Sequence, residues 1–454
     1  MADVNEPGTG GEGSPVATEP TLTAAVVSPP VGPTSNDPDA AVDDTPRSGP
    51  RSPSQIFDDL LGRASDDPGR MVEALVSFLS VVIATALILR TLHFGEMWAD
   101  TTPTGGDMGA HVWGPRYLLD NLLPNFRLSG WTPDWYNGFP AYQFYMVIPS
   151  LMIVLLHVGL AAWAAVLVAV AGVAASVAAF FKPRLYAHRY TILAVSVAAV
   201  ILATPVPYNR SFKIISGIGL ICLPLACWAF AKLADLPFPA PPLAAAAALL
   251  FAYNREPLYN NTGNIIGGNF HSTMAGEFAF SISLTLSVLY LGVAARGLKT
   301  GRHRALSAAL FALAGLCHLI PAFFVLACTG ALLVVHPGRE RFRWLATMVP
   351  VAGLLTAWWV VPFWWRRDYV NDMGWERINV YHDFLFWRED LSGGGLIDST
   401  TLALLLAVAL AGGLISFAVR NRGGVALSGF VLALALAFAS VPEGRLWNTR
   451  LLGF

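Results

Sequence analysis

The chain has 454 residues, of which 55% are hydrophobic and 13% charged, and its formal net charge is −1. With a mean hydropathy of +0.54 and a charged fraction well below the roughly 25% of soluble domains, an ordinary soluble globular protein is excluded. The near-zero net charge and the lack of a Lys/Arg cluster argue against nucleic-acid binding. Because apolar runs of about 20 residues can cross a bilayer, we predict an all-α polytopic membrane protein with about ten transmembrane helices.

Residues 1–70 form a segment rich in Pro, Gly, Ser, Thr, Ala and Asp. Such a composition cannot bury enough apolar surface to offset its ordering entropy, so we predict a disordered tail. Four arginines precede the first apolar run, namely Arg47, Arg51, Arg63 and Arg70. The positive-inside rule therefore places the tail in the cytoplasm. The first apolar run starts only near Met71, which argues against a secretory signal.

A multi-span transmembrane domain is expected over residues 71–454, with a first span at 71–92 and a first outer loop at about 93–143. The apolar region 144–181 suits either two spans or one span with a re-entrant piece. Further apolar runs lie at 191–206, 214–233, 242–253, 278–295, 305–335, 344–363, 401–419 and 425–440. The run 305–335 is expected to hold two spans that pivot near His318.

Basic loops predict the orientation of these spans. Three loops are assigned to the cytoplasm by their basic residues, which are Arg296, Lys299, Arg302 and Arg304, then Arg339, Arg341 and Arg343, then Arg420 and Arg422. The polar stretches 93–143, 254–277, 364–398 and 441–454 are then expected on the outer face of the cytoplasmic membrane. Basic residues at 182–189 favour a further cytoplasmic loop, which two full spans within 144–181 would contradict. If 144–181 holds two full spans, the short run 242–253 would not span the membrane. With one span or two in 144–181, residues 254–277 are expected outside.

The first outer loop holds a carboxylate on a glycine-rich turn, Asp107, followed by His111. Residues 110–123 place apolar side chains near one helical face, which predicts a short helix lying along the membrane surface. Three candidates for substrate binding follow in an aromatic-rich stretch typical of the interface, Asp134, Trp135 and Tyr136. A carboxylate held here can meet a substrate whose lipid tail is in the bilayer. The alternative is that Asp107 caps a helix that begins at Met108 or Gly109.

A second outer cluster, 267–278, leads directly into a span and contains His271 and Glu277. Ionisable residues near the head-group level are costly and usually functional. The alternative is a helix N-terminus, with Ser272 or Thr273 as its cap and Glu277 favoured by the macrodipole. Both interpretations remain open.

Two other places carry ionisable side chains. His318 interrupts an apolar stretch, where a histidine is more often a turn or packing residue than a proton shuttle. The outer stretch 366–376 begins with two arginines, which indicate either an anionic partner or ordinary interfacial snorkelling. It also contains the candidate substrate-binding residues Asn371, Asp372 and Trp375.

These motifs, in this order, resemble the bacterial membrane family called 6-pyruvoyl-tetrahydropterin-synthase-related proteins, itself similar to GT-C glycosyltransferases. The matching residues are Gly106, Asp107, His111, the run from Pro133 to Gly138, the run from Ala275 to Phe278, His318, the run from Asn371 to Trp375 and the run from Asn448 to Leu451. The resemblance covers the chain from about Met71 onward. No trio of histidines has the spacing of the zinc site in the soluble pterin synthase, so a pterin role is not expected.

The resemblance implies a transferase that moves a sugar from a polyprenyl phosphate to a cell-envelope glycan or glycolipid acceptor on the outer face. Asp107 would be the general base, with His111 and Glu277 beside it, and the reaction would invert the anomeric carbon. Cations would stabilise the departing lipid phosphate, the candidates being Arg116, His271, His318 and Arg450. A divalent cation could take Asp107 and Glu277 as oxygen ligands, but the first loop lacks an Asp-x-Asp pair and we predict no metal site.

Two other classes of function compete with this one. A transporter or flippase usually places ionisable residues or broken helices at mid-membrane in repeated halves, and no such repeat is evident. A non-catalytic scaffold of envelope synthesis need not bring Asp107, Glu277, Asp372 and Arg450 together. Since the chain ends soon after Arg450, we also expect it to be part of a longer protein with further spans.

Overall fold

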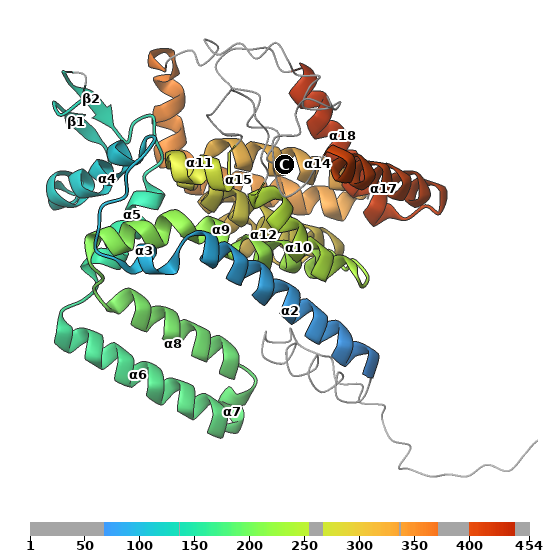
Figure 1. Cartoon of the computed structure of the whole chain (residues 1–454), viewed down its shortest axis with the longest axis horizontal. Coiled ribbons are helices and arrows are strands. Elements are labelled where there is room, and N and C mark those ends of the chain that lie inside the picture. The colour runs from blue at the N-terminus through green and yellow to red at the C-terminus, as the bar shows by residue number, and fades with distance from the viewer. Residues whose placement is uncertain (1–67, 136, 254–266, 336, 371–398, 441–454) are drawn as a thin grey trace, which may run out of the picture. The chain divides into compact units, whose positions relative to one another are not determined.

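The computed structural model describes residues 68–135, 137–253, 267–335, 337–370 and 399–440, and it is almost entirely helical (Figure 1). By length and composition, five helical segments in this part of the chain could cross a membrane: Pro68–Thr91, Ala162–Phe181, Tyr208–Leu233, Phe270–Thr300 and Arg339–Trp365. Shorter apolar helices of 10–17 residues accompany them. The chain is thus an α-helical protein with several apolar helices able to span a membrane. Ten spans remain a prediction. Residues 1–67 of the expected tail lie outside the described residues, whereas residues 68–70, also assigned to the tail, begin the first described helix.

The first described helix is α2 (Pro68–Thr91), and the segment that follows it carries most of the short elements. These are α3 (Phe94–Trp98), α4 (Met108–Tyr117), the π-helical turn η1 (Leu118–Leu122), the 3₁₀ turn η2 (Leu123–Asn125), β1 (Gly130–Thr132) and β2 (Phe139–Ala141). The helix expected at 110–123 is confirmed as part of the continuous run of α4, η1 and η2, and its position along a membrane surface stays a prediction. Leu118 and Leu122 are buried on one side of it, while Arg116 and Asp120 are exposed on the other. This amphipathic pattern is the one that a helix on an apolar surface requires.

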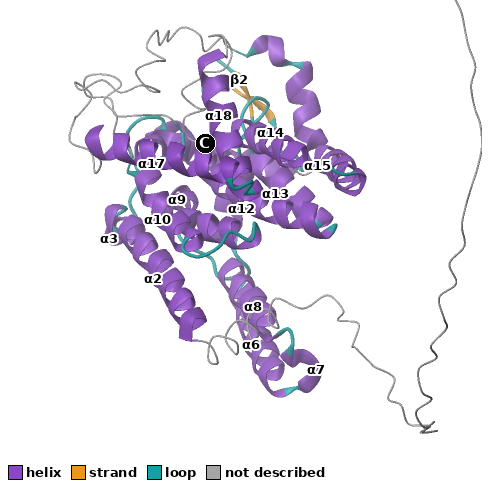
Figure 2. Cartoon of the chain, turned by 90° about the vertical axis from the view of Figure 1, so that its right-hand side faces the viewer, coloured by secondary structure: helices purple, strands orange, loops and turns teal. Residues whose placement is uncertain are grey.

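The strands β1 and β2 form an antiparallel hairpin that pairs Gly130 with Ala141 and Thr132 with Phe139. Figure 2 shows these strands beside otherwise helical segments. The hairpin was not predicted from the sequence, because strands of three residues are too short to show an alternating pattern.

Region 144–181 contains one short and one long helix, α5 (Ile148–Val158) and α6 (Ala162–Phe181). At 11 residues, α5 is too short to cross a bilayer, so the structure agrees with one span and a short piece. A turn with α7 (Pro183–Tyr186) leads into α8 (Arg189–Ala203), which packs along α6. The basic residues at 182–189 therefore lie at the turn of a helical hairpin.

The remaining helices are α9 (Tyr208–Leu233), α10 (Ala240–Ala252), α11 (Phe270–Ser272), the π-helical turn η3 (Thr273–Glu277), α12 (Phe278–Thr300), α13 (Arg304–Cys317), α14 (Leu319–Val335), α15 (Arg339–Trp365), the 3₁₀ turn η4 (Arg367–Tyr369), α17 (Ser399–Ala418) and α18 (Arg422–Ser440). The expected division of 305–335 is confirmed, because α13 and α14 meet at His318 in an extended conformation.

Helices α9 and α12 form the central pair of this part of the chain, and small residues let them approach closely. A Cβ on Gly219 of α9 would lie 2.6 Å from the backbone nitrogen of Ile282 in α12. The Thr285 hydroxyl donates a hydrogen bond to the carbonyl oxygen of Gly219 at 2.7 Å. Small residues and hydroxyl groups at such a crossing are typical of helix pairs in membranes, where dispersion contacts and interhelical hydrogen bonds hold helices together.

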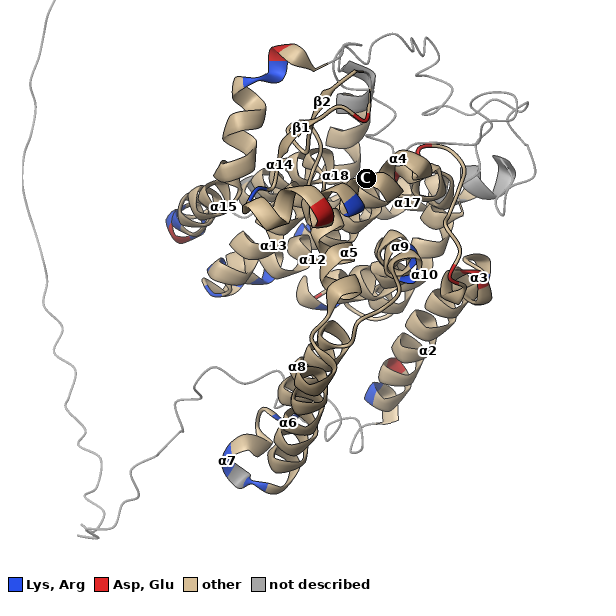
Figure 3. Cartoon of the chain, turned by 90° about the vertical axis from the view of Figure 1, so that its left-hand side faces the viewer, with Lys and Arg blue, Asp and Glu red and all other residues tan. Residues whose placement is uncertain are grey.

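Charged side chains are concentrated at helix ends and in connecting segments, as Figure 3 shows, and the helix bodies are nearly free of them. Many large apolar side chains on the helix bodies are exposed, including Val170 in α6 at 60% and Leu354 in α15 at 76%. Exposed apolar surface on this scale is costly in water but normal against lipid. This distribution agrees with a membrane location.

Candidate functional site

The Asp107 carboxylate stands at the start of α4 without capping it. Gly105 and Gly106 precede it with φ of +99° and +50°, values that glycine adopts without a Cβ penalty. Helix α4 begins at Met108, so Asp107 has the N-cap position, yet its side chain makes no capping hydrogen bond. Helix α4 thus begins where the alternative interpretation expected, with Asp107 exposed at its N-cap position, and only the side-chain capping bond is missing.

The second outer cluster is capped differently from the expectation. The Asn269 side chain accepts a hydrogen bond from the Ser272 backbone nitrogen at 2.9 Å, so neither Ser272 nor Thr273 is the cap. The Ser272 hydroxyl instead accepts a bond from the Gly267 nitrogen at 2.8 Å, and the Thr273 hydroxyl pairs with that of Ser281. These bonds satisfy buried polar groups and fix the chain as it enters α12.

Gly276 ends the π-helical turn η3 with φ of +122°, and Glu277 follows it directly before α12. The kink places the half-buried Glu277 side chain at the N-terminus of α12, without a capping bond.

The two outer clusters interlock through backbone contacts and glycines. The Asp107 nitrogen donates a hydrogen bond to the Ala275 carbonyl oxygen at 2.7 Å. A Cβ on Gly106 would lie 2.8 Å from the Ala275 Cα, too close for any side chain. A Cβ on Gly276 would lie 2.9 Å from His111 Cδ2 and 3.0 Å from Asp107 Cβ. The structure thus brings Asp107, His111 and the Gly276–Glu277 turn together from distant parts of the chain.

His111 lies half-buried beneath this turn. Its ring is 5.2 Å from that of Tyr145 and 5.4 Å from that of Phe278, the latter in an edge-on arrangement. Burial lowers the pKa of His111 below its usual value, and the nearby Asp107 charge opposes this without reversing it. The imidazole is therefore neutral at pH 7 and can accept a proton or a hydrogen bond.

Arg116 is not adjacent to Asp107. Nine residues of helix separate the two Cα atoms by about 13 Å. The Arg116 Nε is 3.3 Å from Asp120 Oδ2, and its guanidinium carbon is 5.3 Å from the centre of the Tyr208 ring. Because both members of this ion pair are more than half exposed, it contributes little to stability.

Asp134 and Trp135 belong to an aromatic group between α4 and the β hairpin. The Trp113 indole nitrogen donates a hydrogen bond to Asp134 Oδ2 at 2.9 Å, and its ring lies 6.2 Å from that of Trp135. The Tyr117 hydroxyl donates to the Trp131 carbonyl oxygen at 2.8 Å. Trp113, which joins helix and hairpin, was not predicted from the sequence, although its one-turn spacing from Tyr117 was a usable signal.

His318 lies at the break between α13 and α14. Its Nδ1 accepts a hydrogen bond from the Ile320 nitrogen at 3.3 Å, and its ring is 4.9 Å from that of Phe280. The Ser283 hydroxyl donates to its carbonyl oxygen at 3.0 Å. These contacts agree with a turn residue. His271 lies half-buried in α11, six positions before Glu277.

Several expected site residues lie outside the described residues: Tyr136, Asn371, Asp372, Trp375 and Arg450. Within the described ranges, no three His, Cys, Asp or Glu side chains are close enough together to hold a metal ion.

A lysine that the sequence analysis did not single out holds the segment leading to Asp107. Lys213 in α9 donates three hydrogen bonds, to the carbonyl oxygens of Glu96 at 2.7 Å and Ala99 at 3.1 Å and to the Thr101 hydroxyl at 2.7 Å. A lysine near the start of an apolar helix, opposite an outer loop, is the signal that could have identified it. Its contacts anchor residues 96–101, which lead to Asp107, to helix α9.

No protein-family model, curated protein or solved structure matches this chain. The family resemblance and the glycosyltransferase function therefore stay predictions.

Proposed function

We propose that this chain is a membrane glycosyltransferase that moves a sugar from a polyprenyl phosphate to a cell-envelope acceptor at the outer face of the membrane. One observation carries the proposal. The exposed Asp107 carboxylate makes no capping hydrogen bond, and two interlocked glycine turns hold it beside His111 and the turn that carries Glu277. A carboxylate held in place at the end of apolar helices suits a substrate whose lipid tail is in the bilayer.

In the proposed reaction, an acceptor hydroxyl attacks the sugar C1 while the bond from C1 to the phosphate oxygen breaks. Asp107 accepts the hydroxyl proton, and the polyprenyl phosphate leaves with the bonding electrons. Attack opposite the leaving group inverts the anomeric carbon. Neutral His111 can accept a hydrogen bond from the sugar that receives the transferred group. Because it carries no positive charge, it does not weaken Asp107 as a base.

The leaving phosphate needs positive charge or hydrogen-bond donors nearby. His271, in the turn before Gly276, is the described candidate nearest Glu277 in the chain. Arg450 is proposed for the same role from the resemblance alone. Trp113 and Trp135, on α4 and the hairpin, offer aromatic faces on which a sugar ring can stack.

The test uses the full chain reconstituted in lipid nanodiscs with radiolabelled polyprenyl-phosphate sugars and an envelope extract as acceptor. We expect Asp107→Asn to lower transfer at least about 100-fold, as loss of a general base does, with an unchanged melting temperature. Asp100→Asn is the matched control, because Asp100 lies in the same loop and only accepts a bond from Asn209 at 3.0 Å. Equal transfer by both variants would remove Asp107 from the mechanism. Lipid flux without a glycosyl product would favour a flippase.

A further inference from the structure

A cavity of about 460 Å³ lies at the ends of α9 and α12 that are remote from Asp107. From Glu277 to Lys299, 22 residues of helix separate the two regions by about 33 Å. That distance is close to the thickness of the hydrocarbon core of a bilayer. If Asp107 is at one membrane surface, the cavity is at the other, and its volume is in the range of small-molecule sites.

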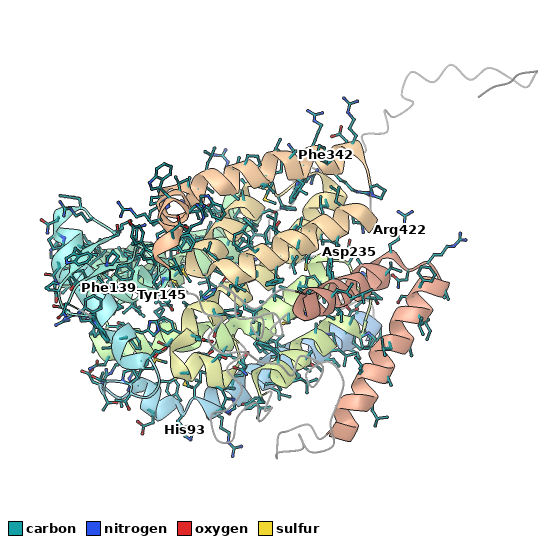
Figure 4. The ribbon with its side chains drawn as sticks, turned by 90° about the horizontal axis from the view of Figure 1, so that it is seen from above. His93, Phe139, Tyr145, Asp235, Phe342 and Arg422 are labelled. Carbon is teal, nitrogen blue, oxygen red and sulfur yellow. The ribbon has the colours of Figure 1, made fainter. Side chains whose placement is uncertain are left out.

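The charged groups that line this cavity are mostly positive. Lys299, Arg341 and Arg422 line it together with one carboxylate, Asp235. Asp235 already accepts bonds from two cations, Lys299 Nζ at 2.5 Å and Arg296 Nη1 at 2.7 Å. Figure 4 shows Asp235 and Arg422 at neighbouring positions where α18 begins. Among the described lining residues the cations outnumber the one carboxylate, so this lining is electropositive.

Apart from Asn421, the remaining lining residues are apolar, and they lead away from the charges. Leu298, Leu332 and Phe430 line the cavity, and α18 adds Ala426 and Leu427 on the way from Arg422 to Phe430. The cations are thus at one end of an apolar wall formed by a helix whose outer side exposes Val431 at 63% and Leu432 at 60%. A soluble anion would need only the charges, whereas this arrangement also suits an acyl chain.

We propose that this cavity binds the head group of an anionic phospholipid from the membrane leaflet on the side of the basic loops. The phosphate would lie among Lys299, Arg341 and Arg422, with the acyl chains along the apolar residues of α18. Basic pockets between helices on the cytoplasmic side attract anionic lipids because phosphate charge and apolar chain are recognised together. This site is separate from the proposed transfer site and does not depend on it.

The experiment titrates the purified full chain with phosphatidylglycerol and with phosphatidylcholine of the same acyl chains, and counts bound lipids by native mass spectrometry. We expect the variant Lys299→Gln/Arg422→Gln to bind phosphatidylglycerol at least about tenfold more weakly than the wild type. The matched control is Arg304→Gln/Arg343→Gln, which removes the same charge from exposed basic residues that do not line the cavity. The control is expected to bind within about twofold of the wild type.

A second variant, Leu427→Trp, fills the cavity without changing charge, so it separates lost binding from lost folding. It should weaken phosphatidylglycerol binding while the melting temperature in detergent is retained. Equal phosphatidylglycerol binding by the cavity and control double variants would overturn the proposal. Displacement of the lipid by an equal concentration of inorganic phosphate would overturn the lipid assignment in favour of a soluble anion.

Discussion

Replacing Gly276 by alanine tests whether the loop that carries Asp107 and the turn before Glu277 are locked together. At φ of +122° a residue with a Cβ is strained by about 1–3 kcal/mol. The new Cβ would also meet His111 Cδ2 at 2.9 Å and Asp107 Cβ at 3.0 Å, and such overpacking costs a further 1–3 kcal/mol or so. With partial relaxation of the loops, we expect a local destabilisation of about 2–4 kcal/mol.

Hydrogen exchange of the Asp107 amide measures this locally, because that amide donates its bond to the Ala275 carbonyl oxygen. At tenfold per 1.4 kcal/mol, exchange should accelerate about 30-fold to 700-fold. Gly109→Ala is the first control, since its Cβ meets nothing within 4 Å and its backbone is helical. Gly105→Ala is the second control. Its φ of +99° strains the backbone, but its Cβ would meet nothing within 4 Å, so it measures backbone strain without steric overlap. Exchange in Gly276→Ala no faster than in Gly109→Ala would refute the interlock.

Three further variants probe the surroundings of this site. Burial holds the His111 pKa of the folded chain below its usual value, so His111 is protonated at a higher pH in the unfolded chain than in the folded chain. Stability therefore falls as the pH drops below about 6.5. His111→Gln should reduce this loss, measured as the difference in melting temperature between pH 7.5 and pH 5.5. Lys213→Met should cost about 2 kcal/mol and expose the outer loop to limited proteolysis, unlike Lys299→Met. Gly219→Val should lower the melting temperature by separating α9 from α12, whereas Gly330→Val, in open space, should not.

Some features of the fold follow from local sequence pattern and could be predicted. The surface helix, the break at His318 and the apolar character of the long helices each depend on residues within one or two turns of each other. The hairpin was missed because its pairs, such as Trp131 with Pro140, lie in strands of three residues. The extent of the short helices, such as α5 and α10, was uncertain because apolar composition alone does not determine where a helix ends.

The candidate site was predictable in its members but not in its geometry. Asp107, His111 and Glu277 stand out because polar side chains next to apolar runs are unusual. Their meeting depends on Gly106 and Gly276, each of which permits contact with a segment far away in the chain. In the sequence these glycines are indistinguishable from ordinary turn residues. Only the partner backbone, supplied by the fold, shows why no side chain fits.

The position of the site also depends on helix contacts away from the polar residues. Phe278 begins α12 and packs against both His111 and Phe212 of α9, with ring centres 5.4 Å and 5.5 Å apart. One turn further along, α12 crosses α9 at Gly219 at a separation that leaves no room for a Cβ. The crossing therefore fixes how far α12 extends toward the outer loop, and with it the position of the turn that contacts Asp107. An apolar contact between two helices thereby determines the placement of a polar site, which is why the glycine of α9 belongs to the same physical unit as the carboxylate.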